Sequence, residues 1–324
     1  MNATRLAVTV TLVLALLPAT PAAEAQSAGT VPRIGIVCPW PAADPLTGVW
    51  RAALNDVGYV EGKNIVVEWR FADGRTERLP TLAAELARLN LDAIVTAGDL
   101  AIRAVQQATT TIPIVVASDD LVGEGHVASL ARPGKNVTGV SILASELNAK
   151  RLELLKQAIP AASRIAVLWD PATGTFHLSA LHAAARSLKV ELKILEVRRL
   201  EDLDRAFEAA RAWRAEALNV LASPLLHTLR RPIIDRAARH GLTAIYQWGE
   251  IAREGGLMSY GPAFLDVLRA LFVQLDRVLK GARPADLPVS QPTRFELVIN
   301  LKTAKALGRA IPQAVLTRAD EVIN

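Results

Sequence analysis

Small and polar residues gather where apolar runs of this sequence end. The apolar run at residues 93–95 is followed by Thr96, Ala97, Gly98 and Asp99, and a helical pattern begins at once. That order predicts a buried strand, a tight turn and a helix start. In open parallel α/β sheets, ligands bind at the carboxyl ends of strands, where helix N-termini offer unpaired N–H groups. Gly98 permits a positive φ or a close approach of the backbone to a ligand, whereas Asp99 suits either an N-cap or a binding site.

Other predicted strand ends carry comparable groups. In chain order these candidate binding residues are Cys38, Trp40, Ser118, Asp119, Trp169, Asp170, Ser223 and Tyr246. Any one aromatic residue is consistent with ordinary packing, but the chain has only six tryptophans and three tyrosines. Aromatic groups at strand ends in both halves therefore favour a site for an apolar or ring-bearing ligand. Helix N-termini and hydroxyl groups would hold its polar end, and Asp99, Asp119 or Asp170 would hold an ammonium.

Signatures of catalysis and of cofactor binding are missing or misplaced. Gly62-Lys63 and Gly134-Lys135 lack the flanking residues of a phosphate-binding loop. The stretch GEGHVA at residues 123–128 matches G-x-G-x-x-A, but it follows the fourth predicted strand rather than the first. The chain contains neither HExxH nor the nucleophile elbow G-x-S-x-G. We therefore expect no enzyme, no cofactor and no metal site.

The elements that must position these residues alternate between strands and helices. Strands are predicted at 33–38, 64–70, 91–97, 113–118, 136–141, 164–169, 190–197, 216–223 and 243–247. Helical patterns separate them, including a short one between the fourth and fifth strands. Continuous apolar strands joined by helices are typical of parallel sheets covered on both faces. The same element order occurs twice, which predicts an α/β protein of two Rossmann-like lobes with a ligand cleft between them.

The last part of the chain suggests how the two lobes are connected. An amphipathic helix is predicted from Phe264 to Lys280, a proline-rich stretch follows, and FELVINLKTAKALG predicts a strand running into a helix. We assign residues 26–143 plus 263–290 to lobe 1, and residues 144–262 plus 291–324 to lobe 2. The first crossing lies at residues 142–150, and several crossings would let rigid lobes open and close about a few linker residues.

Residues 1–25 are predicted to be a secretory signal peptide. Arg5 provides the positive start, residues 6–17 form an apolar run, and Ala23-Glu24-Ala25 is a cleavage pattern before Gln26. An uncleaved anchor is the alternative, but the run is short for a span of about 20 residues. The sole cysteine, Cys38, lies well beyond this region, so neither a lipid anchor nor an internal disulfide is expected.

The charge pattern argues against a nucleic-acid partner. The net charge is +5, and the signs alternate along segments such as VRRLEDLDRAFEAARAWR. This alternation is typical of solvated helix faces, and no basic block or aromatic-basic stripe interrupts it.

Longer stretches carry a resemblance to a known family. These are DVGYVEGKNIVVEWRFADGRTERLPTLAAELARL, ASLARPGKNVTG, KRLELLKQ, GGLMSYGP and LPVSQPTRFELVINLKTAKALG. In this order they resemble the bacterial periplasmic substrate-binding proteins of the tryptophan/tyrosine-type ABC transport family, over nearly all of the mature chain. The resemblance implies the type I periplasmic binding protein fold with three hinge crossings, and delivery of a small solute to a membrane permease.

The resemblance also implies a position for the cleft and two departures from the family's pattern. It adds Tyr260 to the candidates above. Relatives commonly have a Ser-Pro-Gly-like turn where this chain has Cys38-Pro39-Trp40, and a Gly-Thr-Pro-like turn where it has Gly98-Asp99-Leu100. Trp40 would narrow the cleft. Asp99 would put a negative charge where a ligand carboxylate is held, which argues against an amino-acid ligand.

The leading interpretation is a periplasmic solute receptor, monomeric, that delivers an amino acid or aromatic solute to an ABC permease. Ligand binding would stabilise a closed arrangement of the lobes. An exported α/β enzyme such as a hydrolase, and a sensor domain that reports ligand binding to a membrane receptor, are the alternatives from other classes.

Overall fold

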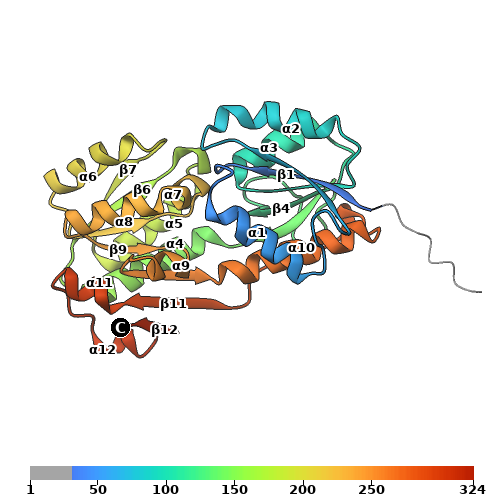
Figure 1. Cartoon of the computed structure of the whole chain (residues 1–324). Helices are drawn as coiled ribbons and strands as arrows, with labels where there is room; N and C mark the ends of the chain where they lie inside the picture. The colour runs from blue at the N-terminus through green and yellow to red at the C-terminus, as the bar shows by residue number, and fades with distance from the viewer. Residues whose placement is uncertain (1–30) are drawn as a thin grey trace, which may run out of the picture. The chain divides into compact units, whose positions relative to one another are not determined.

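Two β-sheets with helices on their faces form the protein (Figure 1). The computed structural model describes residues 31–324, apart from the side chains of residues 145, 176 and 177, so the predicted signal peptide lies outside the described residues. The first sheet has the order β2-β1-β3-β4-β5, and all its strands are parallel. Its strands are β1 (Arg33–Cys38), β2 (Val66–Phe71), β3 (Ala93–Ala97), β4 (Ile114–Ser118) and β5 (Val137–Ser141).

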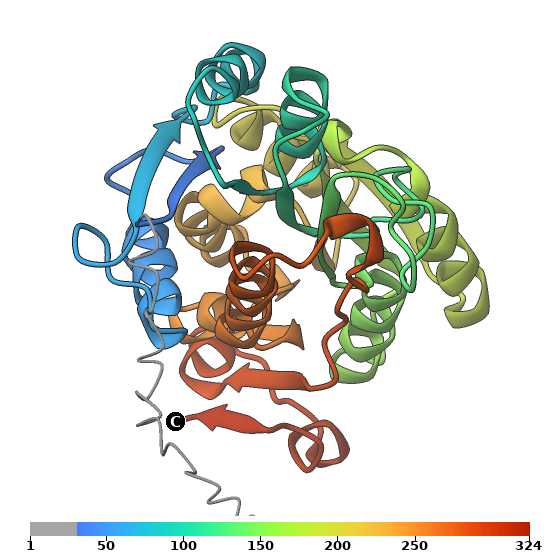
Figure 2. The ribbon, with the colours of Figure 1, turned by 90° about the vertical axis from the view of Figure 1, so that its right-hand side faces the viewer.

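The second sheet has seven strands in the order β12-β11-β10-β9-β8-β6-β7. They are β6 (Arg164–Trp169), β7 (Glu191–Glu196), β8 (Ala217–Val220), β9 (Thr243–Tyr246), β10 (Met258–Pro262), β11 (Phe295–Asn300) and β12 (Glu321–Ile323). All neighbours are parallel except β10 and β11, which are antiparallel. Figure 2 shows β11 and β12 beside the C-terminus, where they extend the sheet. The predicted class, an α/β protein with two sets of parallel strands, is confirmed.

Side chains alternate between the two faces of the first sheet, and helices cover both. Ile34 and Ile36 pack into one cluster with α1 (Pro45–Asp56) and α10 (Phe264–Leu279), which lie side by side (Figure 1). Val37 packs into the opposite cluster with α2 (Leu79–Ala87) and α3 (Asp99–Ala108). Burial on both faces explains why the strands are apolar runs rather than alternating patterns.

The second sheet repeats this arrangement. Leu168 faces α6 (Asp202–Ala212) and α8 (Arg230–Arg239), whereas Val167 faces α4 (Ala144–Ala158) and α5 (Phe176–Leu188). The shorter helices are α7 (Pro224–Thr228), α9 (Gly249–Arg253), α11 (Leu301–Ala306) and α12 (Gln313–Leu316), and 3-10 turns lie at Thr76–Arg78, Pro171–Thr173 and Pro284–Asp286.

The chain passes between the two sheets at three places. The first is the pair Ile142 and Leu143 between β5 and α4, where Leu143 has a φ of 57°. The second is Ala263, between β10 of the second sheet and α10 on the first. The third follows Ser290, whose bridge to Val140 ties it to the first sheet before β11 begins. The exact lobe boundaries stay a prediction.

One local expectation is wrong. The segment between β4 and β5 was expected to contain a short helix, but it folds as turns. It contains Gly123, Gly125 and Pro133, and the Asp120 carboxylate accepts a hydrogen bond from the Gly123 N–H at 2.9 Å. An aspartate that bonds a nearby backbone N–H favours a turn over a helix. The strand predicted in FELVINLKTAKALG is present as β11; it follows the third crossing and is antiparallel to β10, a direction that the sequence analysis did not predict.

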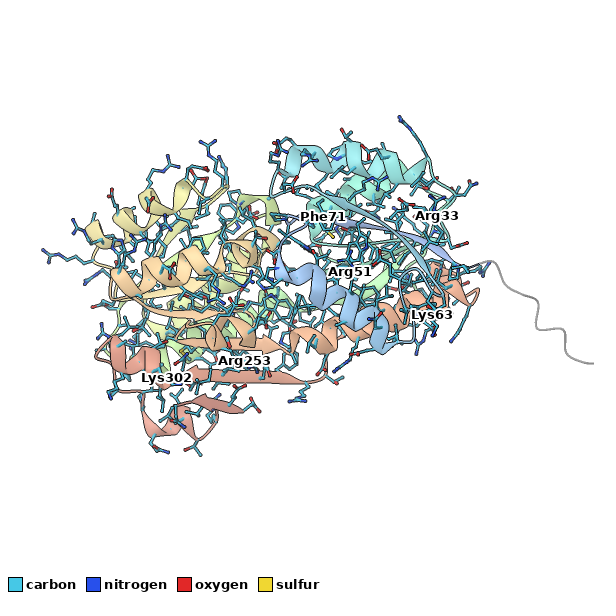
Figure 3. All side chains as sticks on the ribbon, viewed as in Figure 1. Arg33, Arg51, Lys63, Phe71, Arg253 and Lys302 are labelled. Carbon is cyan, nitrogen blue, oxygen red and sulfur yellow. The ribbon has the colours of Figure 1, made fainter. Side chains whose placement is uncertain are left out.

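The alternating charges of the sequence form ion pairs on the surface (Figure 3). Arg51 Nε lies 2.9 Å from Glu61 Oε2, and Arg253 Nη2 lies 2.6 Å from Glu321 Oε2. Such exposed pairs each contribute about 0–1 kcal/mol to stability, so the packed clusters hold the fold. Within residues 31–324, no helix has the length and apolar character needed to cross a bilayer.

Candidate ligand-binding site

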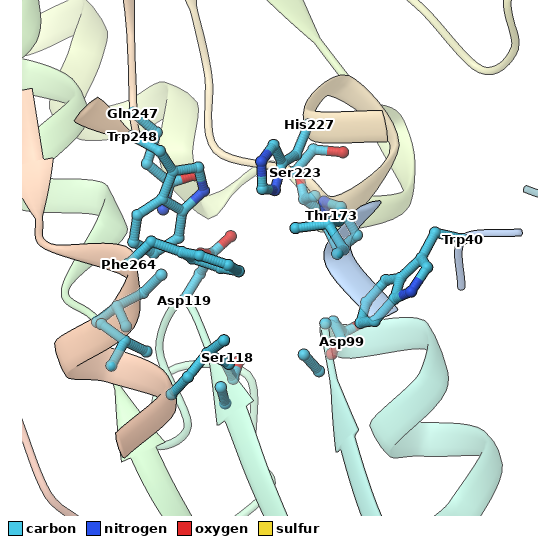
Figure 4. A pocket seen from close by; sticks show the side chains of 18 of the residues that line it. Trp40, Asp99, Ser118, Asp119, Thr173, Ser223, His227, Gln247, Trp248 and Phe264 are labelled. Atoms are coloured by element: carbon cyan, nitrogen blue, oxygen red, sulfur yellow. The ribbon is translucent and has the colours of Figure 1, made fainter. Parts of the chain in front are cut away.

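A pocket lies where strands of both sheets end (Figure 4). Its empty volume is about 760 Å³, which includes space that is open to solvent. The lining residues are Trp40, Leu46, Trp50, Ala97, Gly98, Asp99, Ala117, Ser118, Asp119, Glu124, Ile142, Thr173, Ser223, Pro224, His227, Gln247, Trp248, Phe264, Val267 and Leu268. They follow β1, β3, β4 and β5 of the first sheet and β6, β8, β9 and β10 of the second, or belong to α1 and α10. The site therefore draws on both halves of the chain.

Aromatic rings form two walls of the pocket. On one side, Trp40 packs against Trp50 with ring centroids 5.2 Å apart, and the Trp40 Nε1–H donates to Thr47 Oγ1 at 3.3 Å. On the other side, Trp248 and Phe264 meet edge to face with centroids 4.9 Å apart. Figure 4 shows Trp40 opposite Trp248 and Phe264, with an open space between them. Rings held by such contacts present a rigid apolar surface to a ligand.

The start of α3 brings the two halves into contact. Gly98, not Asp99, is the N-cap, with a φ of 87° and a ψ of 143°, and Asp99 is the first residue of the helix. A Cβ on Gly98 would lie only 2.6 Å from Cγ of Pro224, the first residue of α7. Only glycine combines this backbone conformation with so close an approach. The contact between Gly98 and Pro224 closes one edge of the pocket.

A buried histidine holds two carboxylates on the pocket wall. His126 is 1% exposed; its Nε2 lies 2.9 Å from Asp99 Oδ1 and 3.3 Å from Glu124 Oε2, and its Nδ1 lies 2.8 Å from Gln106 Oε1. Burial opposes the charged ring, but hydrogen bonds to Asp99 and Glu124 outweigh it and raise the pKa of His126. Burial also acts against ionised Asp99, yet hydrogen bonds from His126 and Arg103 lower the pKa of that carboxyl. Burial raises the pKa of Glu124.

The same cluster is the one place among residues 31–324 where three possible metal ligands lie within 4.8 Å of one another. The Nδ1 atom of His126 pairs with Gln106, whereas Nε2 faces the carboxylates of Asp99 and Glu124. The raised pKa of His126 opposes metal binding here, because a histidine must be deprotonated to ligate a metal ion.

A second buried pair lies at the start of α7. The Ser223 hydroxyl donates to Asp170 Oδ2 at 2.7 Å and accepts from the N–H groups of Leu225 and Leu226. Burial raises the pKa of Asp170. Asp170 lines a neighbouring pocket of about 500 Å³ that shares Gly98 and Pro224 with the first. Ser223 is therefore a helix cap as well as a lining residue.

His227 places an uncharged ring on the far side of the pocket, with Glu250 behind it. His227 is buried, and burial lowers its pKa to about 3, so the ring is uncharged at neutral pH. Its Nε2 lies 3.5 Å from Glu250 Oε1, and burial raises the pKa of that carboxyl to about 7. The ring of His227 also packs edge to face on Phe264, with centroids 5.4 Å apart.

The structure brings most of the predicted residues together. Those that line the main pocket are Trp40, Gly98, Asp99, Ser118, Asp119 and Ser223, and Asp170 reaches it through its bond to Ser223. Whether these residues bind the ligand stays a prediction.

Four predicted residues lie outside the lining. Cys38 is fully buried because, as the last residue of β1, it points to the same core as Ile36. Trp169 packs into the core of the second sheet and donates its Nε1–H to Gly174 O at 3.1 Å. Tyr246 is 1% exposed inside the core, and Tyr260 stacks on Phe295 away from the pocket. A strand's last residue still obeys the in-out alternation of the sheet, which sends the side chains of Cys38, Trp169 and Tyr246 into the core.

Several lining residues were missed. Trp248 lies two positions beyond the strand end at Tyr246, as Trp40 lies two positions beyond the strand end at Cys38. An aromatic residue two positions after a strand end was therefore the sequence signal that could have identified Trp248. Trp50 and Phe264 belong to helices whose apolar faces suggested only core packing. Thr173 lies in a turn that no sequence pattern singled out. Glu124 lies in the stretch GEGHVA, which was considered only as a cofactor-binding motif.

Comparisons with known proteins agree with this geometry. The profile of the family described as ABC transporter substrate binding protein matches residues 37–323. The chain belongs to this family. Among relatives, the substrate-binding protein is 27% identical over 281 residues to the tyrosine-binding protein of Clostridioides difficile (strain R20291), covering 82% of this chain and 77% of the relative.

Two solved structures share the fold of this substrate-binding protein. A conserved domain protein from Vibrio cholerae superimposes with a TM-score of 0.83 at 26% identity, over 90% of this chain and 100% of that one. An ABC domain from Streptococcus pneumonia, in complex with L-Trp, superimposes with a TM-score of 0.82 at 23% identity, over 91% of this chain and 100% of that one. The expected family is therefore confirmed, together with a role in binding a solute rather than hydrolysing it.

Proposed function

We propose that this substrate-binding protein is exported to the periplasm, closes on a small aromatic solute and presents the closed form to an ABC permease. Residues 1–25 would be removed as a signal peptide, and the mature chain would act as a monomer. The family supports the transport role, and the relative named for tyrosine supports a ligand with one aromatic ring.

The observation that carries the proposal is the pocket with aromatic walls from both halves of the chain. Trp40 belongs to the first half, whereas Trp248 follows a strand of the second. A ring bound between them would contact both halves at once, so its binding energy would favour the closed arrangement. The polar groups at Ser118, Asp119 and Ser223 would then fix its orientation.

A thermal-shift screen of the mature protein tests solute binding. It would cover amino acids, aromatic acids, aromatic amines and small peptides, since a ligand at 100 times its Kd stabilises the folded state by about 2.7 kcal/mol. We expect at least one ring-bearing solute to raise the melting temperature, and Trp248→Ala to abolish that rise. Trp69→Ala is the matched control, because Trp69 lies on the edge strand β2 and does not line the pocket. No stabilising solute, or equal losses in both variants, would refute the proposed site.

Export and delivery need separate measurements. The N-terminus of protein recovered from the periplasmic fraction is expected at Gln26, and an intact residue 1 on membrane-bound protein would contradict cleavage. Reconstituted with its ABC permease and ATPase, the ligand-loaded protein is expected to stimulate ATP hydrolysis, and the Trp248→Ala variant is expected not to stimulate it.

A further inference from the structure

The charges that face the pocket are all of one sign. Asp99, Asp119 and Glu124 line it, and none of the described lining residues is Lys or Arg. His227, which also lines it, is neutral at pH 7 because burial lowers its pKa to about 3. A ligand entering the pocket therefore meets carboxylates and no exposed cation.

The cations near these carboxylates lie behind them. His126 is 1% exposed and is held between Asp99 and Glu124. Arg103 Nε reaches Asp99 Oδ2 at 2.9 Å from the exposed face of α3, and the buried guanidinium of Arg151 donates to the carbonyl of Tyr260. None of the three cations lines the pocket. They moderate the repulsion among the carboxylates, but they offer no donor to a ligand's carboxylate.

Two of the helices whose first turns line the pocket, α3 and α7, are poor sites for an anion. Asp99 is the first residue of α3, so its own carboxylate occupies the turn where an anion would bind. In α7, Pro224 has no N–H, and the N–H groups of Leu225 and Leu226 are bonded to Ser223 Oγ. A carboxylate would thus be left without a partner there, which costs several kcal/mol for a buried charge.

Two further features suit an amine on an aromatic body. The faces of Trp40, Trp248 and Phe264 attract both rings and cations. Gln247 is 6% exposed and lines the pocket, and its Nε2 has no hydrogen-bond partner among the described residues. A buried amide donor of this kind calls for a hydrogen-bond acceptor on the ligand, and a phenol oxygen is one such group.

We propose that the ligand is a protonated amine on an aromatic body, with a neutral hydrogen-bond acceptor and without a carboxylate. The ammonium binds beside Asp119 and Glu124, the ring lies between the aromatic walls, and the acceptor faces Gln247. This inference rests on the proposed function and narrows its ligand from an aromatic solute to an arylalkylamine.

Three compounds with the same ring test it by calorimetry on the mature protein. Tyramine carries only the amine, L-tyrosine carries amine and carboxylate, and 3-(4-hydroxyphenyl)propanoate carries only the carboxylate. We expect tyramine to bind at least tenfold more tightly than L-tyrosine, and the acid not to bind. Equal or tighter binding of L-tyrosine or of the acid overturns the inference and leaves the proposed function standing.

The remaining outcomes are also decisive. If none of the three compounds binds, the test passes to the solute that raises the melting temperature most in the thermal-shift screen. An amine without a carboxylate supports the inference, and a solute that carries a carboxylate overturns it. If no solute of any class binds, the proposed function itself fails. The two failures are therefore distinguishable.

Charge-neutral variants give an independent test. Asp119→Asn and Glu124→Gln each keep the shape of the side chain. Each is expected to lower the affinity for tyramine at least tenfold and to change the affinity for L-tyrosine less. The control is Asp266→Asn, an exposed position on α10 outside the pocket. Melting curves identify any variant that fails to fold, and the other variant then carries the test. Unchanged tyramine affinity in a folded variant of either position overturns the inference.

Discussion

A methyl group added at Gly98 should prevent the protein from closing on its ligand. In Gly98→Ala the new Cβ would lie 2.6 Å from Pro224 Cγ, whereas carbon atoms in favourable contact are about 3.5–4.0 Å apart. Overpacking of this size costs about 1–3 kcal/mol, and the halves must separate to relieve it. Since 1.4 kcal/mol is a factor of ten, we expect ligand affinity to fall by about 10-fold or more.

The backbone adds a second, distinct cost. Gly98 has a φ of 87°, so alanine there is strained by about 1–3 kcal/mol whether the protein is open or closed. Gly58→Ala is the matched control, because Gly58 has a φ of 93° and a methyl group there would meet no other side chain or backbone segment within 4 Å. It should lower the melting temperature to a similar extent without changing affinity.

Calorimetry with the solute found in the screen separates the two costs. In the double variant Gly98→Ala, Pro224→Ala, the clashing Cγ is gone, so affinity should recover while the loss of thermal stability remains. Wild-type affinity in Gly98→Ala, or no recovery in the double variant, would refute the contact between Gly98 and Pro224 as a feature of the bound state.

The remaining predictions concern the core and its buried ionisable groups. Phe272→Ala should lower the free energy of unfolding in urea by about 3–5 kcal/mol, because Phe272 is fully buried against Trp50. The exposed neighbour Val273 supplies the control: Val273→Ala should change the free energy of unfolding by less than about 0.5 kcal/mol. Burial raises the pKa of Glu250 from 4.5 to about 7, so the folded state loses stability as pH rises through this window, by at most about 3 kcal/mol. Glu250→Gln should therefore be more stabilising at pH 8 than at pH 5 in urea titrations, and the same effect at both pH values would contradict this. Burial raises the pKa of the Cys38 thiol, so a thiol reagent should label it only after unfolding; rapid labelling of native protein would disprove its burial.

Periodicity in the sequence determined most of the elements. The strands at 33–38 and 164–169 occur with the predicted bounds, and the helix predicted from Phe264 to Lys280 spans Phe264–Leu279. These segments bury their side chains within short stretches of chain, so an apolar run or a 3.6-residue period is sufficient to recognise them. The segment between β4 and β5 was mispredicted because the Asp120 turn competes locally with a helix.

Only part of the candidate site could be predicted from the sequence. Gly98 and Asp99 were recognised because a turn after a buried strand has a local signature. Tyr246 was named as a candidate and Trp248 was not considered. The sequence shows where a strand ends only to within a residue or two, and the alternation of the sheet decides which side chains point into the core.

The sequence by itself determined the alternation of strands and helices, their apolar cores and the strand-end turns, because each depends on residues close together in the chain. Only the tertiary structure decided that His126 lies between Asp99 and Glu124, that Pro224 touches Gly98, and that no described cation lines the pocket. These facts depend on distances between segments far apart in sequence. Such distances are set by how two sheets pack and where the chain crosses between them, and no local pattern records them.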